Sequence, residues 1–357
     1  MYKLDQASDV RKEETINLDS LRSYLNKNLN NSLPLELLQY PSGYSNLTYL
    51  LKMGSQEMVL RRPPFGANVK SGHDMKREFT ILGALKNNFN KAPLPIIFCD
   101  DKKIIGDEFY VMEKVNGTIF RGSQPKSELP KSDLIPGLVS SFVNTLSEIH
   151  SLKTTEIGLQ DFGKPKGYVD RQVNGWIKRY NNVKTHDFIG IDKTIDWLSK
   201  NTPSNSESCL IHNDFKFDNL MFEIKDKVEV NAVLDWEMST IGDPLMDLGT
   251  SLGYWIHKTD PEMIQKLKLN ITSLEGVPSR DELVHLYGET SGRSVQNILF
   301  YFIFGLFKIA GIIQQIYYRY QMGFTKDPRF KDLDKGVKML GSMSFQAIQK
   351  RKIDYLF

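Results

Sequence analysis

Four short apolar runs mark the first 115 residues, at positions 47–53, 58–60, 96–98 and 109–112. Their length, their β-branched and aromatic residues and the turn residues between them are typical of β-strands. The first two runs are separated by a turn that contains Gly54, so the pattern predicts a hairpin. We therefore expect this part of the chain to consist mostly of strands.

Helical spacing occurs twice within the same part of the chain. Leu18, Leu21, Leu25 and Leu29 recur every three or four residues, with Asp19 and Ser20 near the start as candidate caps. A second helix is predicted at 74–85, because its apolar residues fall on one face.

Beyond Gly117 the pattern becomes mainly helical. We predict helices at 138–152, 169–180 and 194–198, short strands and loops within 210–236, and helical structure from about residue 244 to the end. A strand-rich part followed by a helix-rich part indicates an α+β fold with two lobes. We place these lobes at residues 1–115 and 116–357.

One apolar run, at 298–307, carries no charge and is followed by Lys308 and a second apolar stretch. A membrane-spanning helix needs about 20 predominantly apolar residues. Because Lys308 interrupts this run and Gln314 and Gln315 end it, we interpret it as a buried core helix. A membrane segment and an exposed dimer helix are the alternatives.

The overall composition excludes several classes of protein. The 46 Lys and Arg residues nearly balance 43 Asp and Glu, which argues against a polybasic protein that binds nucleic acid. Two cysteines, Cys99 and Cys209, are too few for a disulfide framework or a cysteine-rich zinc site. The first 15 residues are polar and lack the apolar core of a signal peptide. We expect a cytoplasmic protein with neither nucleic acid nor membrane as a partner.

The densest polar cluster is the segment 211–220, and Asp235 follows fifteen residues later. In both places carboxylates stand next to apolar residues. Burying a carboxylate costs free energy unless a cation or hydrogen bonds compensate. Asn219 and Asp235 offer the oxygen ligands that Mg²⁺ prefers, which leaves Asp214 to orient or deprotonate a hydroxyl. A pair of Asx turns at strand ends is the alternative interpretation.

The spacing His-x-Asp, then Asn five residues later, then Asp-Trp-Glu resembles the aminoglycoside phosphotransferase family. That resemblance implies a bilobal protein-kinase-like fold, with a small antiparallel sheet in the first lobe and a mainly helical second lobe. It also implies that Asp214 is the catalytic base, that Asn219 and Asp235 bind Mg²⁺, and that His212 braces the loop. Asn213 stands where glycine is usual, as in loops that resemble those of choline kinases.

The same resemblance implies that the first lobe binds ATP. Arg61 stands where the kinase fold has its phosphate-pairing lysine, and Glu78 matches the helix glutamate that pairs with it. A surface charge pair is the alternative, and Arg62 is the inward residue if the strand register is shifted by one. The implied nucleotide contacts are Gly43, Ser45, Asn46, Arg61, Glu78, Glu113 and Val115. Asp247 resembles the aspartate that fixes the catalytic loop, or is simply a favourable charge near a helix N-terminus.

Further motifs resemble the branch that contains the kinase-like domain of acyl-CoA dehydrogenase fusion proteins: Arg61-Arg62-Pro63-Pro64, Arg171-Gln172-Val173 and Gly242-Asp243-Pro244. Residues 153–200 contain nine Lys and Arg against six Asp and Glu, which favours a neutral or anionic acceptor over a polycationic one.

These observations predict an ATP-dependent kinase that phosphorylates a hydroxyl of a small metabolite, with a hydroxyacyl-CoA as one candidate. The alternatives are a catalytically silent kinase-like nucleotide-binding protein, an aminoglycoside- or choline-type kinase, and an unrelated metal phosphoesterase.

Overall fold

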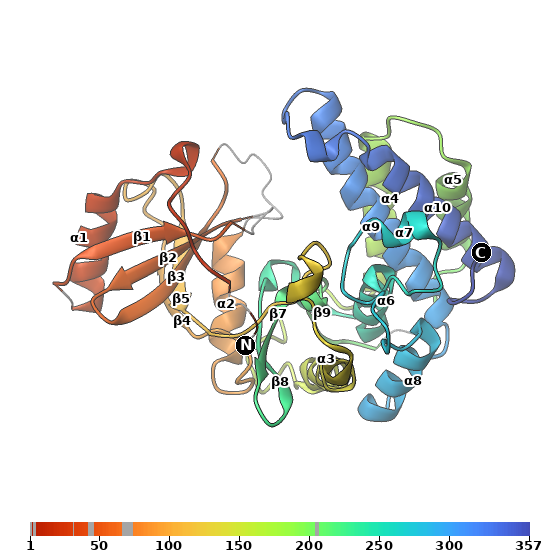
Figure 1. Cartoon of the computed structure of the whole chain (residues 1–357), viewed down its shortest axis with the longest axis horizontal. Helices are drawn as coiled ribbons and strands as arrows, with labels where there is room; N and C mark the ends of the chain where they lie inside the picture. The colour runs from red at the N-terminus through yellow and green to blue at the C-terminus, as the bar shows by residue number, and fades with distance from the viewer. Residues whose placement is uncertain (1, 3–4, 31, 42–45, 66–73, 204–206) are drawn as a thin grey trace. The chain divides into compact units, whose positions relative to one another are not determined.

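The computed structural model describes residues 2, 5–30, 32–41, 46–65, 74–203 and 207–357 (Figure 1). The chain forms two compact units: unit 1 comprises Met1–Ile119 and Leu220–Ser239, and unit 2 comprises Phe120–Asn219 and Thr240–Phe357. The first is built around a sheet and the second around helices, so the α+β prediction is confirmed.

The division differs from the predicted boundary at residue 115 in one instructive respect. Residues 220–239 belong to unit 1, because their hairpin is tied to the end of that unit's first segment. Thr118 and Phe222 form an isolated β-bridge, and the side chain of Asn231 donates to the carbonyl of Asn116. Such long-range pairing is invisible to a pattern read along the chain.

Unit 1 contains an antiparallel sheet whose described strands lie in the order β1-β2-β3-β5-β4. Their bounds are β1 Leu35–Gln39, β2 Leu47–Met53, β3 Gln56–Arg62, β5 Phe109–Glu113 and β4 Pro95–Cys99. All four predicted runs lie within these strands, and the hairpin turn contains Gly54 at a φ of 61°. Successive side chains of a strand point to opposite faces, so each strand contributes side chains to both faces of the sheet.

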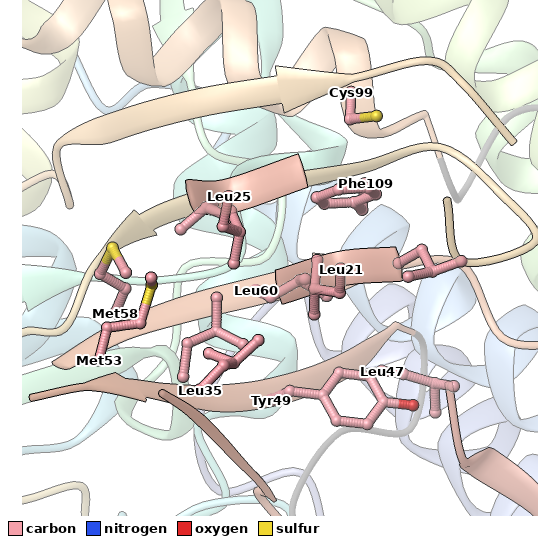
Figure 2. Close-up of a cluster of buried hydrophobic side chains, with 13 residues drawn as sticks. Leu21, Leu25, Leu35, Leu47, Tyr49, Met53, Met58, Leu60, Cys99 and Phe109 are labelled. Atoms are coloured by element: carbon pink, nitrogen blue, oxygen red, sulfur yellow. The ribbon is translucent and has the colours of Figure 1, made fainter. Parts of the chain in front are cut away.

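One face of the sheet is covered by helix α1, Leu18–Leu29. Leu21 and Leu25 pack on the side chains that share this face, among them Tyr49, Leu60 and Phe109 (Figure 2). Burying a leucine contributes roughly 1.5–3 kcal/mol, so this cluster anchors the helix. The predicted caps were wrong by two or three residues. The cap is Asn17, whose side chain accepts from the backbone N–H of Ser20 at 3.0 Å.

The other face carries helix α2, Met75–Leu85, which begins at the cap Asp74. Phe79 of this helix lies 6.1 Å, ring centre to ring centre, from Tyr110 of β5. Unit 1 is completed by the hairpin β7 Leu220–Ile224 and β8 Val228–Val233 and by the short 3-10 helices η1 Lys12–Glu14 and η5 Trp236–Met238. The Trp236 ring packs edge-on against Phe89, which places η5 beside α2.

Unit 2 contains the predicted helices, somewhat longer than expected. The described helices are α3 Ile135–Ser151, α4 Tyr168–Asn182, α5 Ile189–Lys200, α6 Pro244–Tyr254, α7 Glu262–Gln265, α8 Arg280–Ser291, α9 Ile298–Gln321 and α10 Leu333–Lys350. Short elements complete it: η2 Lys126–Glu128, η3 Ser132–Leu134, η4 Phe217–Asn219, η6 Pro328–Phe330, and the paired strands β6 Cys209–Ile211 and β9 Thr240–Gly242.

Helix α9 contains the long apolar run. By length and composition alone it could cross a membrane, yet 78% of its most apolar window is buried in the folded protein. It crosses α6 at very short range, because a Cβ placed on Gly305 would lie 2.0 Å from the carbonyl oxygen of Gly249. Only glycine permits such an approach of two helix backbones. The observed surroundings of α9 are those of a core helix.

Candidate active site

Unit 1 holds a cluster of charges around Arg61 of β3. Its Nη2 lies 2.7 Å from Asp235 Oδ1, and its Nη1 lies 3.5 Å from Glu78 Oε1. Strand alternation turns the next residue, Arg62, to the opposite face, where it donates to the carbonyls of Pro63 and Ile105. The inward residue on the α2 side of the sheet is therefore Arg61.

Local structure explains how these groups meet. Glu78 projects from the first turn of α2, and its Oε1 also accepts from the backbone N–H of Trp236 at 3.1 Å. Asp235 has a left-handed backbone, with φ 68°, where β8 gives way to η5. That turn brings the carboxylate back toward Arg61.

A third carboxylate, Glu237, lies 3.7 Å from Arg61 Nη2. In the sequence this residue stands out only as part of Asp-Trp-Glu. Its Oε2 also accepts from the side-chain amide of Asn46, one of the predicted nucleotide contacts, which is buried. Two other predicted contacts, Gly43 and Ser45, lie outside the described residues.

The charges of the cluster around Arg61 shift one another's pKa values. Burial lowers the pKa of Arg61, but Glu78 and Asp235 outweigh that effect and raise it, so the guanidinium stays charged. Burial raises the pKa of Glu78, opposed by Arg61. Three carboxylates, those of Glu78, Asp235 and Glu237, thus lie near one guanidinium. A carboxylate-rich site of this kind suits a divalent cation.

Glu113 and Val115, the predicted adenine contacts, stand at and just beyond the end of β5. The backbone N–H of Glu113 donates to the carbonyl of Leu94 at 2.9 Å, and its side chain accepts from the N–H of Leu94. The Glu113 N–H is therefore already engaged. Within the described part of the chain the N–H of Val115 donates to no carbonyl or side chain, which leaves it available to a ligand.

Unit 2 holds the loop that contains Asp214. Its Oδ2 accepts from Lys216 Nζ at 2.8 Å and from Asn219 Nδ2 at 3.0 Å. The same amide donates to the Asp214 carbonyl at 2.9 Å, so Asn219 closes the loop on itself. The Asp214 side chain is 15% exposed, which leaves its carboxylate accessible to a small molecule.

His212 and Asp247 brace this loop from inside. The buried Asp247 accepts from the backbone N–H of His212 at 2.6 Å and from that of Asn213 at 2.8 Å. His212 in turn accepts from the N–H of Asp214 through Nδ1, at 3.3 Å. The predicted bracing positions of His212 and Asp247 are thus in contact with the loop backbone.

No motif in the sequence singles out His150 of α3. It is fully buried, with Nε2 3.2 Å from Asp247 Oδ2 and Nδ1 2.7 Å from the hydroxyl of Tyr287. Burial alone raises the pKa of Asp247, but the hydrogen bond to His150 and the nearby His212 lower it by more. The pKa of Asp247 is therefore below its ordinary value, and the carboxylate remains ionised. No local signal in the sequence marks this partnership.

Lys216 is a second residue that sequence reasoning missed. Burial lowers its pKa, but Asp214 and Tyr254 outweigh burial and raise it. Its ammonium also lies 4.7 Å from the ring centre of Tyr254, a cation–π distance. Burial raises the pKa of the neighbouring Asp218 to about 6, opposed by Lys216 and Arg121.

The predicted metal ligands are divided between the two units, Asp235 in unit 1 and Asn219 in unit 2. Because Asn219 Nδ2 donates to Asp214, its Oδ1 is the atom that could face a cation. Across the described ranges, no group of three or more His, Cys, Asp and Glu is arranged to hold a metal. Each of the two residues offers an oxygen of the kind that Mg²⁺ prefers.

Comparisons with known proteins match most of this chain. Residues 36–270 match the family model described as "Phosphotransferase enzyme family". The chain is 38% identical over 324 residues to rat "Acyl-CoA dehydrogenase family member 11", covering 88% of the chain and 41% of the relative. It is 36% identical to mouse "Acyl-CoA dehydrogenase family member 10", over 96% of the chain and 32% of the relative. The chain therefore spans about two fifths or less of these relatives.

Solved structures share the fold over nearly the whole chain. A protein from Ralstonia eutropha jmp134 with a proposed aminoglycoside phosphotransferase activity superposes with a TM-score of 0.79 and 28% identity, covering 94% of this chain and 99% of that one. Choline kinase from Cryptosporidium parvum Iowa II gives a TM-score of 0.61 at 15% identity, covering 96% and 100%. The kinase-like fold and the family resemblance predicted from the loop motifs are confirmed.

Proposed function

The chain belongs to the phosphotransferase enzyme family, and we propose that it transfers the γ-phosphate of ATP to a hydroxyl of a small metabolite. The observation that carries this proposal is the carboxylate of Asp214, partly exposed and oriented by Lys216 and Asn219. A carboxylate held in this way can accept the hydroxyl proton as the oxygen attacks.

We assign ATP to the residues of unit 1. Arg61 offers several N–H donors in one plane to phosphate oxygens, and Glu78 keeps the guanidinium in place. Val115 offers a backbone N–H to the adenine, and Gly43, Ser45 and Asn46 are proposed phosphate contacts. Aminoglycoside phosphotransferase APH(4)-Ia, solved with AMP-PNP and hygromycin B, shares the fold at a TM-score of 0.59 and 12% identity, over 92% of this chain and 98% of that one.

Asp235 and Asn219 would hold Mg²⁺, which supplies positive charge to the phosphates when it is bound. We assign proton transfer and the support of the loop to the chain's own residues. Asp214 takes the proton of the acceptor hydroxyl while the new O–P bond forms and the bond between the γ-phosphorus and the leaving ADP oxygen breaks. His212 and Asp247 hold the backbone, so that Asp214 does not need to reorganise during transfer.

The acceptor is proposed to be neutral or anionic. Lys216 lies beside Asp214, and Arg179 on α4 lies over the ring of Trp176, so the cations of unit 2 favour a negatively charged group. The relatives are named as acyl-CoA dehydrogenase family members, which makes a hydroxyacyl thioester of coenzyme A our preferred candidate. A choline- or aminoglycoside-type acceptor is the second candidate, since proteins of those names share the fold.

The deciding experiment measures ATP consumption and product phosphorylation against hydroxyacyl-CoA, choline, amino-alcohol and aminoglycoside acceptors, with and without Mg²⁺. We expect Mg²⁺-dependent turnover with a hydroxyacyl-CoA that disappears in Asp214→Asn. The same protein should be assayed for ATP binding by calorimetry. ATP binding without turnover on any acceptor would instead favour the catalytically silent alternative.

A further inference from the structure

The backbone of the active-site loop is strained at the residue before Asp214. Asn213 has a φ of 67°, in the left-handed region that glycine enters freely and most other residues avoid. An asparagine tolerates this conformation better than most residues, but it still needs support. The support comes from hydrogen bonds with neighbouring helices.

Both backbone groups of Asn213 are held, each by a different helix. Its N–H donates to Asp247 Oδ1 of α6 at 2.8 Å, and its carbonyl accepts from Lys308 Nζ of α9 at 2.5 Å. Its side-chain amide lies 3.1 Å from the hydroxyl of Tyr168 on α4. Three separate helices therefore converge on one residue of the loop.

The crossing of α6 and α9 fixes where the two charged side chains emerge. The helices touch at Gly249 and Gly305, where neither backbone has room for a Cβ. Asp247 precedes the first glycine by two residues, and Lys308 follows the second by three, about one helical turn. Any shift of α9 along α6 would move the ammonium away from the loop.

Lys308 occupies an unfavourable place for a charge. It is 2% exposed and lies in the apolar stretch of α9, and within the described ranges no carboxylate comes within ion-pair distance of it. Burial lowers the pKa of Lys308 to about 8, opposed by the more distant Asp214 and Asp247. Its one described hydrogen bond is the one to the Asn213 carbonyl. A methionine would fill this space without the cost of desolvating an ammonium.

We propose that Lys308 is a positioning residue, which holds the carbonyl of Asn213 so that the left-handed turn presents Asp214 in its reactive orientation. This inference rests on the role of Asp214 in the proposed function. It assigns the effect of Lys308 to the transfer step and not to ATP binding, because Lys308 and Asn213 both belong to unit 2, whereas Arg61 belongs to unit 1.

The test compares Lys308→Met with the parent and with Lys338→Met, which alters an exposed lysine of α10. We expect Lys308→Met to lower kcat at least about tenfold and to change KM for ATP by less than about twofold. Hydrogen exchange of the segment 211–216 should become faster in Lys308→Met and stay unchanged in Lys338→Met. If Lys308→Met does not fold, Lys308→Leu, which also removes the N–H donor, takes its place.

The decisive comparison repeats the substitution in an Asn213→Gly background. Glycine adopts the left-handed conformation without help, so Lys308→Met should cost less than about threefold there. An equal loss in both backgrounds, or a Lys308→Met enzyme with unchanged kcat and unchanged exchange, would overturn the proposal. If the parent phosphorylates no acceptor, the proposed function fails, and the exchange measurements alone still decide the role of Lys308.

Discussion

The charge clusters of the two units are built in opposite ways. Around Arg61 in unit 1, three carboxylates lie near one guanidinium. Around Asp214 in unit 2, Lys216 pairs directly with the carboxylate and the buried Lys308 lies behind the loop. The first cluster is built mainly of carboxylates, whereas the second pairs a carboxylate with a lysine. We infer that the first depends on metal and nucleotide, and that the second is preorganised without them.

The strongest test of this contrast is Asp214→Asn. Loss of the carboxylate removes the proton acceptor, so we expect kcat to fall by about 10²–10⁴. ATP affinity measured by calorimetry should stay nearly unchanged, since the nucleotide is assigned to unit 1. A variant within about threefold of the parent in kcat would remove Asp214 from the mechanism.

Arg61 and Glu78 test whether the other cluster acts as a unit. Arg61→Ala and Glu78→Ala should each lower kcat/KM for ATP by about 10- to 100-fold, because the first leaves the buried Glu78 without its cation and the second removes a carboxylate that holds the guanidinium in place. The double variant should be little worse than either single one, since the two residues contact each other. Arg61→Lys should keep measurable activity with a raised KM for ATP, because a lysine offers one charge on a flexible stem.

Arg62→Ala is the matched control for these variants. Arg62 faces the opposite side of the sheet and donates to backbone carbonyls, so its loss should lower thermal stability more than it affects the kinetics of ATP use. Normal KM for ATP in Arg61→Ala together with impaired KM in Arg62→Ala would contradict the assignment.

Metal dependence separates the clusters further. Asp235→Ala should reduce the gain in ATP affinity that Mg²⁺ provides, by about tenfold, since one oxygen ligand is lost. Asp214→Asn should keep that gain in full. Calorimetry with ATP in Mg²⁺ and in a chelator measures both, and an undiminished gain in Asp235→Ala would make this residue purely structural.

The smallest expected effect concerns pH and stability. The pKa of Lys308 falls from 10.5 in the unfolded chain to about 8 in the folded one, so between these values the unfolded state binds more protons. The free energy of unfolding should therefore rise with pH from about 8 to about 10.5, by about 3 kcal/mol from this group. Lys308→Met should lack that rise. Parallel slopes for parent and variant in denaturant titrations across this range would argue against a charged, buried Lys308.

Much of the fold followed from periodicity. The strand runs, the hairpin and the helices were predictable because they depend on neighbours two to four residues apart. The place of residues 220–239 in unit 1 was harder to predict, since it depends on a bridge between Thr118 and Phe222. The family resemblance favoured Arg61 over Arg62, and the contacts of Arg61 with Glu78 and Asp235 gave that choice its chemical meaning.

The sequence by itself indicated the polar core of the loop, because Asp214 and Asn219 lie within six residues and their geometry is local. Tertiary structure alone decided what supports that loop. His150, Asp247 and Lys308 reach it from helices that are distant in sequence, and their positions depend on a crossing set by two glycines. An apolar pattern shows that a helix is buried, but it does not specify which neighbour its one lysine meets. That choice depends on the register of packed backbones, which forms only when the chain folds.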